Sequence, residues 1–357
     1  MTGVQTCALP ISTKFGGYDW RLGGDTPWDT ESDPQYPIGR SQQSPHVVTD
    51  SSSSATSMTA GVKILNGALN IFPDRKYSET IAHWAQREKG YAVGAVTSVP
   101  ISHATPAASY AVNVSRDDYQ DLSRDMLGLP SVTHKANPLP GLDVVLGGGY
   151  GEKTESNKGQ GENFISGNRY LADADRDAAD VSKGGPYGKY VVAERTAGAK
   201  GLDVLREGVG KAVAGKHRLL GFFGASNGHL PFQTANGDYR PVDNVRAAEK
   251  YSPADIEENP TLKDLTEAAI EVLSKRSDKF WLMVESGDVD WANHANDIDC
   301  SIGAVFSGDA AVAAIFQWIE KQNAWEDSMV IVTADHGHFF HLVDPEALIP
   351  SQKPVAK

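Results

Sequence analysis

Residues 47–61 read VVTDSSSSATSMTAG, with four consecutive serines between an aspartate and an Ala-Thr pair. A run of serines is usually a solvated linker, but the residues on both sides of this one indicate an ordered structure. Val47 and Val48 are typical of the end of a short buried strand. Beyond the serines, apolar residues recur at a spacing compatible with a helix packed on a core, at Met58, Val62, Ile64, Leu65 and Leu69. The stretch therefore predicts a strand, an acidic residue and a helix that carries a serine at its N-terminus, where backbone N–H groups and the helix dipole favour an anion.

Strands and helices alternate along the rest of the chain. Apolar runs next to glycine predict buried strands at residues 91–99, 141–149 and 219–224. Two longer units predict a helix that leads into a strand, at residues 264–288 and 309–338, and MVIVT is the strand of the second unit. This alternation indicates an α/β fold, a three-layer sandwich in which helices flank a mostly parallel central sheet.

Residues 78–90 (SETIAHWAQREKG) carry the signature of a helix. Ser78 is the expected N-cap, and a Lys-Gly pair is the expected end. Ile81, Trp84 and Ala85 fall on one face at helical spacing, so we expect this face to pack against the core.

Composition bounds the class of protein. The chain has 357 residues, of which 40% are hydrophobic, enough for a sizeable core. No apolar run approaches the length of a membrane span, so no membrane partner is expected. The formal net charge of −13 disfavours nonspecific binding to nucleic acid. An anionic substrate would need local positive charge, and metal ions are the obvious source.

Residues 12–357 are interpreted as one elaborated domain, because no convincing linker divides them. A polar, glycine-rich segment at residues 151–200 is expected to be an insertion with short elements of its own. Residues 1–11 (MTGVQTCALPI) resemble the translation of a common sequencing adapter and are interpreted as non-native. Cys7 lies there, which leaves Cys300 alone in the rest and predicts no internal disulfide.

Metal-capable side chains follow three of the predicted strands. They are His103 and Thr105 after the first, Glu285, Asp290 and His294 after the second, and Asp335, His336 and His338 after the third. Ligands bind at this edge of an open parallel sheet. Taken alone, each is a weak signal, because an Asp-x-x-x-His pair is more often a surface pair and an Asp-His pair can be a helix cap beside a satisfied histidine. Together they favour a metal site, in which Asp and His suit zinc and Glu and Thr oxygens suit magnesium.

These motifs carry a family resemblance. VTDSSSSAT is similar to the nucleophile motif of the alkaline phosphatases, and GVKILNGAL continues the match. Further similar segments follow in the family's order, namely SHATPAASYAVNVSR, LDVVLGGG, LLGFFG, MVESGDVDWANHAND and VTADHGH. The resemblance covers roughly residues 45–338, and the ordered set is far more specific than any single motif. The chain is identified as a member of this family.

The resemblance implies a role for each matching residue. It makes Ser51 the nucleophile, and Arg116 the clamp for two phosphate oxygens. The implied metal ligands are Asp335 and His336 for one zinc ion, Asp290 and His294 for a second zinc ion, and Glu285 and Thr105 for a magnesium ion. His338 would orient the carboxylate of Asp290, and His103 and Trp291 would tune affinity and pH dependence.

The implied reaction is the hydrolysis of small phosphate monoesters through a phosphoserine intermediate. A serine hydroxyl is a poor nucleophile at neutral pH, and two divalent metals can stabilise the attacking and leaving oxygens. A related phosphodiesterase or sulfatase on the same dimetal scaffold is the alternative enzymatic interpretation. A metal- or phosphate-binding protein without catalysis is the third.

Two ligands that the resemblance implies are missing from this sequence. One is an aspartate in a Gly-Asp-Gly-like turn near the N-terminus, and the other is a late histidine in a His-Thr-Gly context. We therefore expect the chain to be truncated at both ends and, as given, weak or inactive, since loss of metal-site residues lowers affinity and activity. The resemblance also leads us to expect a periplasmic or secreted protein that is possibly a homodimer.

Overall fold

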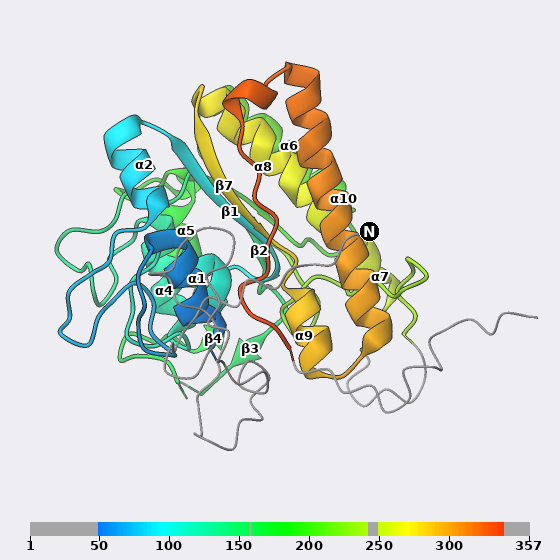
Figure 1. Cartoon of the computed structure of the whole chain (residues 1–357), viewed down its shortest axis with the longest axis horizontal. Helices are drawn as coiled ribbons and strands as arrows, with labels where there is room; N and C mark the ends of the chain where they lie inside the picture. Colours follow the sequence, from blue (N-terminus) through cyan, green and yellow to red (C-terminus); the bar gives the residue numbers. More distant parts are fainter. Residues whose placement is uncertain (1–48, 157–158, 242–248, 339–357) are drawn as a thin grey trace, which may run out of the picture.

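The computed structural model describes residues 49–156, 159–241 and 249–338 (Figure 1). Its centre is a five-stranded sheet in the order β5-β6-β2-β1-β7. The strands are β1 (Ala92–Pro100), β2 (Val144–Gly148), β5 (Tyr190–Glu194), β6 (Arg218–Phe222) and β7 (Phe280–Glu285). Every pair of neighbours in this sheet is parallel. The α/β fold with a mostly parallel sheet is thus confirmed, and β5 brings part of the segment 151–200 into that sheet.

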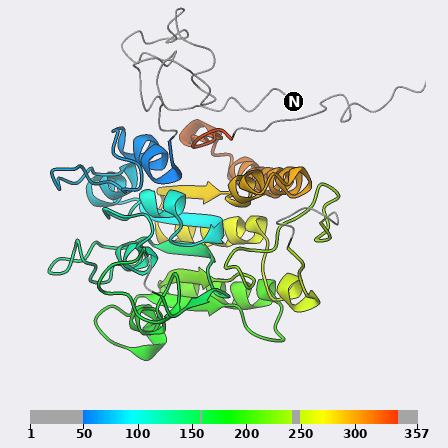
Figure 2. The same cartoon turned by 90° about the horizontal axis from the view of Figure 1, so that it is seen from below.

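Helices cover both faces of the sheet. One face carries α1 (Ser51–Ala60), α2 (Ile81–Lys89), α3 (Ala104–Ala108) and α4 (Tyr119–Leu127). The other carries α6 (Gly201–Gly215) and α8 (Leu262–Arg276), with α10 (Ile298–Gln322) packed on α8. Figure 2 shows the strands in a column between these two groups of helices, which is the three-layer arrangement.

The smaller elements lie in the connections. They are β3 (Lys153–Thr154), β4 (Gly167–Asn168), α5 (Asp173–Ala179), η1 (Val181–Lys183), α7 (Pro253–Glu257), α9 (Asp288–His294) and η2 (Trp325–Asp327). β3 and β4 form an antiparallel pair within the segment 151–200.

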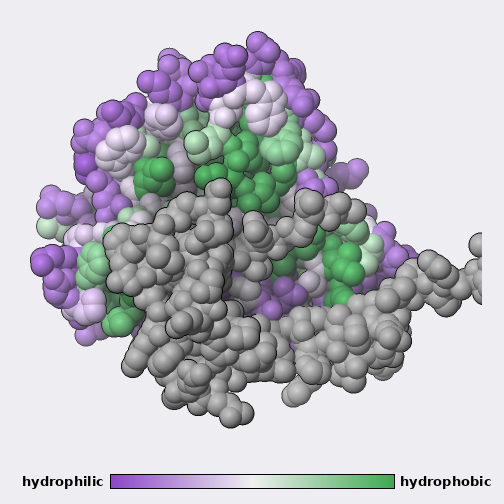
Figure 3. All heavy atoms as spheres, viewed as in Figure 1, coloured by the Kyte–Doolittle hydropathy of each residue, from purple (hydrophilic) through white to green (hydrophobic). Residues whose placement is uncertain are grey.

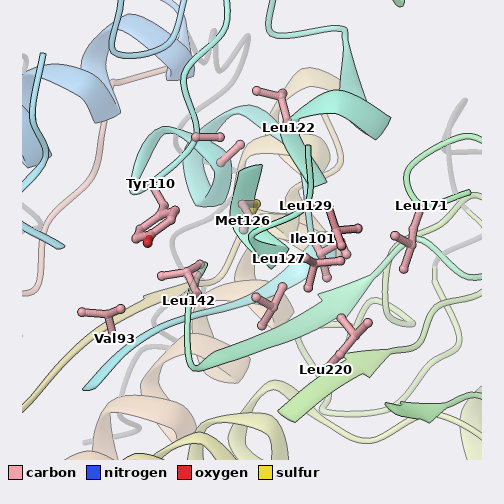
Figure 4. Close-up of a cluster of buried hydrophobic side chains, with 14 of the residues drawn as sticks. Val93, Ile101, Tyr110, Leu122, Met126, Leu127, Leu129, Leu142, Leu171 and Leu220 are labelled. Carbon is pink, nitrogen blue, oxygen red and sulfur yellow. The ribbon is translucent and has the colours of Figure 1, made fainter. Parts of the chain in front are cut away.

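Two hydrophobic clusters hold the layers together, because alternate residues of each buried strand point to opposite faces. In β1, Val93 and Ala95 join the cluster beneath α2, α3 and α4, whereas Ala92 and Val96 join the cluster beneath α6 and α8. Figure 4 shows the first cluster, in which Leu142 lies beside Val93 and Leu127 and Leu129 lie near Ile101. A continuous apolar strand such as this one is therefore explained by burial on both faces.

The helix predicted at 78–90 exists, but its cap and its buried face differ from the prediction. α2 begins after Thr80, whose side chain accepts a hydrogen bond from the His83 N–H, so Ser78 is not the N-cap. Ala82 and Ala85 are buried, whereas Ile81 and Trp84 are 46% and 44% exposed. The small alanines bring the helix close to its neighbours, and the large side chains stay at the rim.

The helix predicted after the serines is shorter than the apolar spacing suggested. α1 begins at Ser51, as expected, and ends at Gly61, where φ is +70°. Met58 and Leu65 are exposed, Ile64 packs partly buried against a small cluster, and Leu69 is the one residue of the expected apolar face that is fully buried. A glycine in the left-handed region ends the helix by a local backbone bond, and this signal outweighs the apolar pattern. The strand expected at Val47 and Val48 lies outside the described residues.

The strand expected in MVIVT is absent from the described residues. Residues 329–333 have no strand pairing, and Met329, Ile331 and Val332 are 85%, 75% and 69% exposed. The segment and α10 lie where Figure 3 shows hydrophobic surface in the middle of this face. Apolar and β-branched residues favour an extended conformation, but a strand also needs a hydrogen-bonded neighbour.

Within the described ranges, α10 is the one helix long and apolar enough to cross a membrane, and it is an exception to the expectation from sequence. Only 28% of its most apolar stretch is buried. Ala304, Ala311, Ala314 and Ile319 are among its buried residues, and α8 is its main neighbour. A core helix of a folded domain meets the same criterion, so this feature alone is weak evidence for a membrane.

Candidate active site

The candidate site lies at the C-terminal edge of the parallel sheet. β1 ends at Pro100 and leads into α3, while β7 ends at Glu285 and leads into α9. α1 packs against α3, which brings the serine run to this edge. Residues 335–338 complete the site from the end of the described chain, and their position there does not depend on a preceding strand.

Ser51 is the first residue of α1 and is 5% exposed. Asp50 caps the helix by accepting a hydrogen bond from the Ser53 N–H. With the N-terminus capped by its neighbour, the Ser51 hydroxyl is available to the site, and its Oγ lies 3.0 Å from His336 Nε2. Ser51 therefore meets the Asp335-His336 pair, although Ser51 and His336 are 285 residues apart in the sequence.

Asp290 on α9 is the centre of a group of imidazoles. Its Oδ1 lies 2.6 Å from His338 Nε2, 3.5 Å from His294 Nε2 and 3.7 Å from His336 Nε2. Burial acts to raise the pKa of Asp290, but the hydrogen bond from His338 and the neighbouring imidazoles outweigh it and lower the pKa. Asp290 is thus an ionised carboxylate among nitrogen ligands.

The donor atoms of Asp290, His336 and His338 lie within 4.8 Å of one another, close enough to hold one metal ion. Imidazole nitrogen with carboxylate oxygen is a donor set that suits zinc. His294 is less enclosed, with a side chain 71% exposed. Asp335 Oδ2 lies 3.6 Å from His336 Nε2 and accepts a hydrogen bond of 3.3 Å from the Ser54 hydroxyl.

Glu285 and Thr105 meet beside this group. Glu285 accepts hydrogen bonds from the hydroxyls of Thr97 and Thr105. Burial, helped by the nearby carboxylates of Asp335 and Asp290, raises the pKa of Glu285 to about 7 against these hydrogen bonds. The Glu285 carboxyl is buried and has like charges nearby, so a cation would stabilise its ionised form. Together with the Thr105 hydroxyl it offers the oxygen ligands that suit magnesium.

Arg116 is paired with Asp50 and is partly exposed. Its Nη1 donates to Asp50 Oδ2 at 3.0 Å, and its side chain is 24% exposed. Burial acts to raise the pKa of Asp50, but hydrogen bonds from Ser52, Ser53 and Arg116 lower it to about 2. The carboxylate therefore fixes one side of the guanidinium and leaves its other N–H groups to bind an anion.

The replacement of Asp50 by asparagine tests this electrostatic coupling. The folded-state pKa is depressed from 3.8 to about 2, so the charged carboxylate stabilises the fold above pH 4 and loses this effect as the pH falls through 2. We expect Asp50→Asn, which keeps a helix cap, to lower the free energy of unfolding by about 2 kcal/mol at pH 6. Urea unfolding at pH 6 and pH 3 should show the deficit shrink at the lower pH. A deficit that does not change with pH would contradict an ionised Asp50.

His103 and Trp291 form an aromatic wall of the site. Their rings meet edge to face with centroids 5.3 Å apart, and His103 also stacks on Tyr119 at 6.3 Å. Burial lowers the pKa of His103 to about 3, and the positive charge of Arg116 acts in the same direction. His103 is therefore a neutral imidazole at neutral pH.

Three residues near the site were missed by sequence reasoning. Asp50 holds Arg116, and its place directly before Ser51 was a signal that could have identified it. Thr97 holds Glu285 from within β1, where a threonine looks like any strand residue. Arg169 pairs with Glu152 at 2.6 Å and lies 5.1 Å over the Tyr119 ring. Arg169 lies in the segment 151–200, and no local pattern marks it.

Comparisons with known proteins agree with the motifs. Residues 22–353 match the model of the family described as alkaline phosphatase. The alkaline phosphatase of Escherichia fergusonii is 30% identical over 320 residues, which are 88% of this chain and 63% of the relative. That of Escherichia coli K12 is 29% identical with the same two shares. This chain thus spans 63% of the length of these curated relatives.

Solved structures show the same fold. The cold-active alkaline phosphatase from the psychrophile Shewanella sp. superposes with a TM-score of 0.51 at 23% identity, over 79% of this chain and 53% of that chain. The alkaline phosphatase of Thermus thermophilus gives a TM-score of 0.51 at 24% identity, over 76% of this chain and 45% of that one.

Proposed function

The chain belongs to the alkaline phosphatase family, and from this premise we propose that it hydrolyses phosphate monoesters with Ser51 as the nucleophile. The observation that carries the proposal is the meeting of Ser51 Oγ with His336 Nε2 at 3.0 Å, beside a group of donor atoms that also includes Asp290 and His338. A lone serine at a helix N-terminus would mean little. A buried serine that faces imidazoles and carboxylates from two distant segments has the parts of a covalent phosphatase.

In the proposed reaction, Ser51 Oγ forms a bond to phosphorus as the bond from phosphorus to the alcohol oxygen breaks. Water then attacks the phosphoserine, which releases phosphate and restores the hydroxyl. Arg116 binds two oxygens of the phosphoryl group through its planar guanidinium, which Asp50 holds in place. The N–H groups at the start of α1 add a partial positive charge beside the same group.

We propose two zinc sites and one magnesium site, held by the residues that the family resemblance assigns. Asp335 and His336 would hold one zinc ion, Asp290 and His294 the other, and Glu285 and Thr105 the magnesium ion. When bound, these cations would lower the pKa of a coordinated hydroxyl and neutralise charge on phosphate oxygens. His338 keeps Asp290 ionised and oriented through its 2.6 Å contact. The carboxylates clustered around Glu285 explain why the site needs cations before it can accept a dianion.

Charge separates a monoesterase from the two rival interpretations. A monoester carries a dianionic phosphoryl group, whereas a phosphodiester or sulfate ester carries one negative charge. Arg116, together with the magnesium ion that Glu285 and Thr105 would hold, would supply more positive charge than a monoanion needs. The site is therefore better matched to the monoester.

Three substrates with a common leaving group test the proposal. We expect the chain, supplied with zinc and magnesium, to turn over p-nitrophenyl phosphate weakly, because two metal ligands are missing, but at least about 100-fold faster than bis(p-nitrophenyl) phosphate or p-nitrophenyl sulfate. A preference for the diester or the sulfate would replace the proposal with the corresponding activity. Phosphate binding without turnover and without a trapped phosphoserine would support the non-catalytic interpretation. The homodimer and the exported location stay predictions.

A further inference from the structure

A second cavity lies at the edge of the sheet opposite the candidate active site. Its volume is about 1090 Å³, and it is lined where β1 and β6 begin, by Ala92 and Arg218, and by Asp143, which precedes β2. The C-terminal ends of α2, α6 and α8 complete the lining. Because the strands are parallel, their N-terminal ends are remote from the edge that carries Ser51.

The wall of this cavity carries a surplus of positive charge around a buried carboxylate. Asp143 Oδ1 lies 2.6 Å from Arg276 Nε and 3.2 Å from Arg218 Nε, and Asp143 is 4% exposed. The other oxygen of the carboxylate accepts the Val93 N–H. One carboxylate therefore serves two guanidinium groups, which leaves one positive charge without a counterion on this wall.

Two lysines increase the surplus. Lys216 and Lys275 line the cavity, and neither has an ion-pair partner in the described part of the chain. Among the charged lining residues, five lysine and arginine side chains face only two carboxylates, in a protein whose net charge is −13. A local field of this sign, within an acidic protein, concentrates anions at the cavity.

The helix dipole accounts for only part of this pattern. Cations at helix C-termini are stabilising, which explains a lysine or arginine in the last turn of α2 or α8 and the lysine that caps α6. It does not explain a cavity, nor two guanidinium groups on one carboxylate. One ring nitrogen of His83, another lining residue, is also buried without a hydrogen-bond partner among residues 49–156, 159–241 and 249–338.

We propose that this cavity binds a small organic polyanion, a compact molecule with two or more carboxylate or phosphate groups on an apolar body. Arg276, Lys216 and Lys275 would receive the anionic groups, as guanidinium and ammonium donors do. Val112, Leu139, Pro140 and Val272 offer apolar contact for the body. A cavity of this volume is at the upper end of the range for small-molecule sites.

Calorimetric titration of the full chain with benzene-1,3,5-tricarboxylate tests the proposal, because this probe has three carboxylates on an apolar ring and contains no bond that a phosphatase cleaves. We expect Lys216→Asn with Lys275→Gln to bind it about tenfold more weakly than the parent, since each lost charge removes one favourable pair. Asparagine suits position 216, where φ is +53°. Lys275→Gln alone, which leaves that backbone position unchanged, should bind about threefold more weakly.

The same two helices supply a matched control. Lys211 on α6 and Lys263 on α8 each pair with a glutamate four residues away and lie outside the cavity. Lys211→Gln with Lys263→Gln lowers the net charge equally, and we expect the affinity of the parent. The proposal would be overturned by any of three results: the parent and all variants bind the probe equally, both double variants lose affinity equally, or the parent does not bind the probe at millimolar concentration. A lower melting temperature without a change in affinity would show that the lysines only stabilise the helix ends.

Discussion

Replacement of Ser51 by alanine is expected to reduce the turnover of p-nitrophenyl phosphate by at least about 1000-fold relative to the parent chain. The change removes the one protein atom that the proposed reaction joins to phosphorus. It should leave the fold intact, because Asp50 caps α1 and, among the described residues, the Ser51 hydroxyl hydrogen-bonds to one side chain, that of His336. Turnover and the melting temperature, measured in zinc and magnesium, separate the two effects.

Ser57 offers the control on the same helix. Its hydroxyl donates to the backbone carbonyls of Ser53 and Val62 and lies away from the candidate ligands. We expect Ser57→Ala to keep turnover within about twofold of the parent. Labelled phosphate at acidic pH, followed by rapid denaturation, should mark the parent and Ser57→Ala but not Ser51→Ala. If Ser51→Ala retained turnover or label, another nucleophile would have to be assigned.

The site was easier to predict from the sequence than the contacts that support it. Residues such as Asp290 and His336 stand in short motifs whose order along the chain is specific, so their assignment did not depend on tertiary structure. Arg169 and Thr97 act through neighbours 17 and 188 positions away, and no local pattern records such distances.

Local propensity also predicted where helices and strands form better than it predicted strand pairing or side-chain burial. β1 and β7 form where apolar runs predict them, because both neighbours of β1 and one neighbour of β7 are present to accept their hydrogen bonds. MVIVT has the same composition and no pairing, since a strand is decided by its partner. The exposed position of Trp84 likewise depends on how closely α2 packs against its neighbours, which the spacing of apolar residues does not predict.

Replacement of Asp290 by asparagine is expected to weaken zinc binding at least about 100-fold, because even changes beyond the direct ligands of a metal cost 10–100-fold. Asparagine keeps the shape and one acceptor oxygen, so the difference isolates the charge. In the parent, the contact with His338 and the adjacent imidazoles keep Asp290 ionised against the effect of burial. Competition with a fluorescent zinc chelator measures the affinity directly and does not depend on turnover.

Asp288 is the matched control on the same helix. Its carboxylate accepts hydrogen bonds from the hydroxyls of Ser98 and Ser286, and it is 3% exposed. Asp288→Asn should lower the melting temperature, because it changes a buried group that accepts two hydrogen bonds. Zinc affinity should stay within about threefold of the parent, because Asp288 is bonded to serines and not to His294, His336 or His338. Equal losses of zinc in both variants would mean that general loosening of α9 disrupts the site. A loss confined to Asp290→Asn would mean that the ionised carboxylate of Asp290, which lies beside His294, His336 and His338, is itself needed to hold zinc.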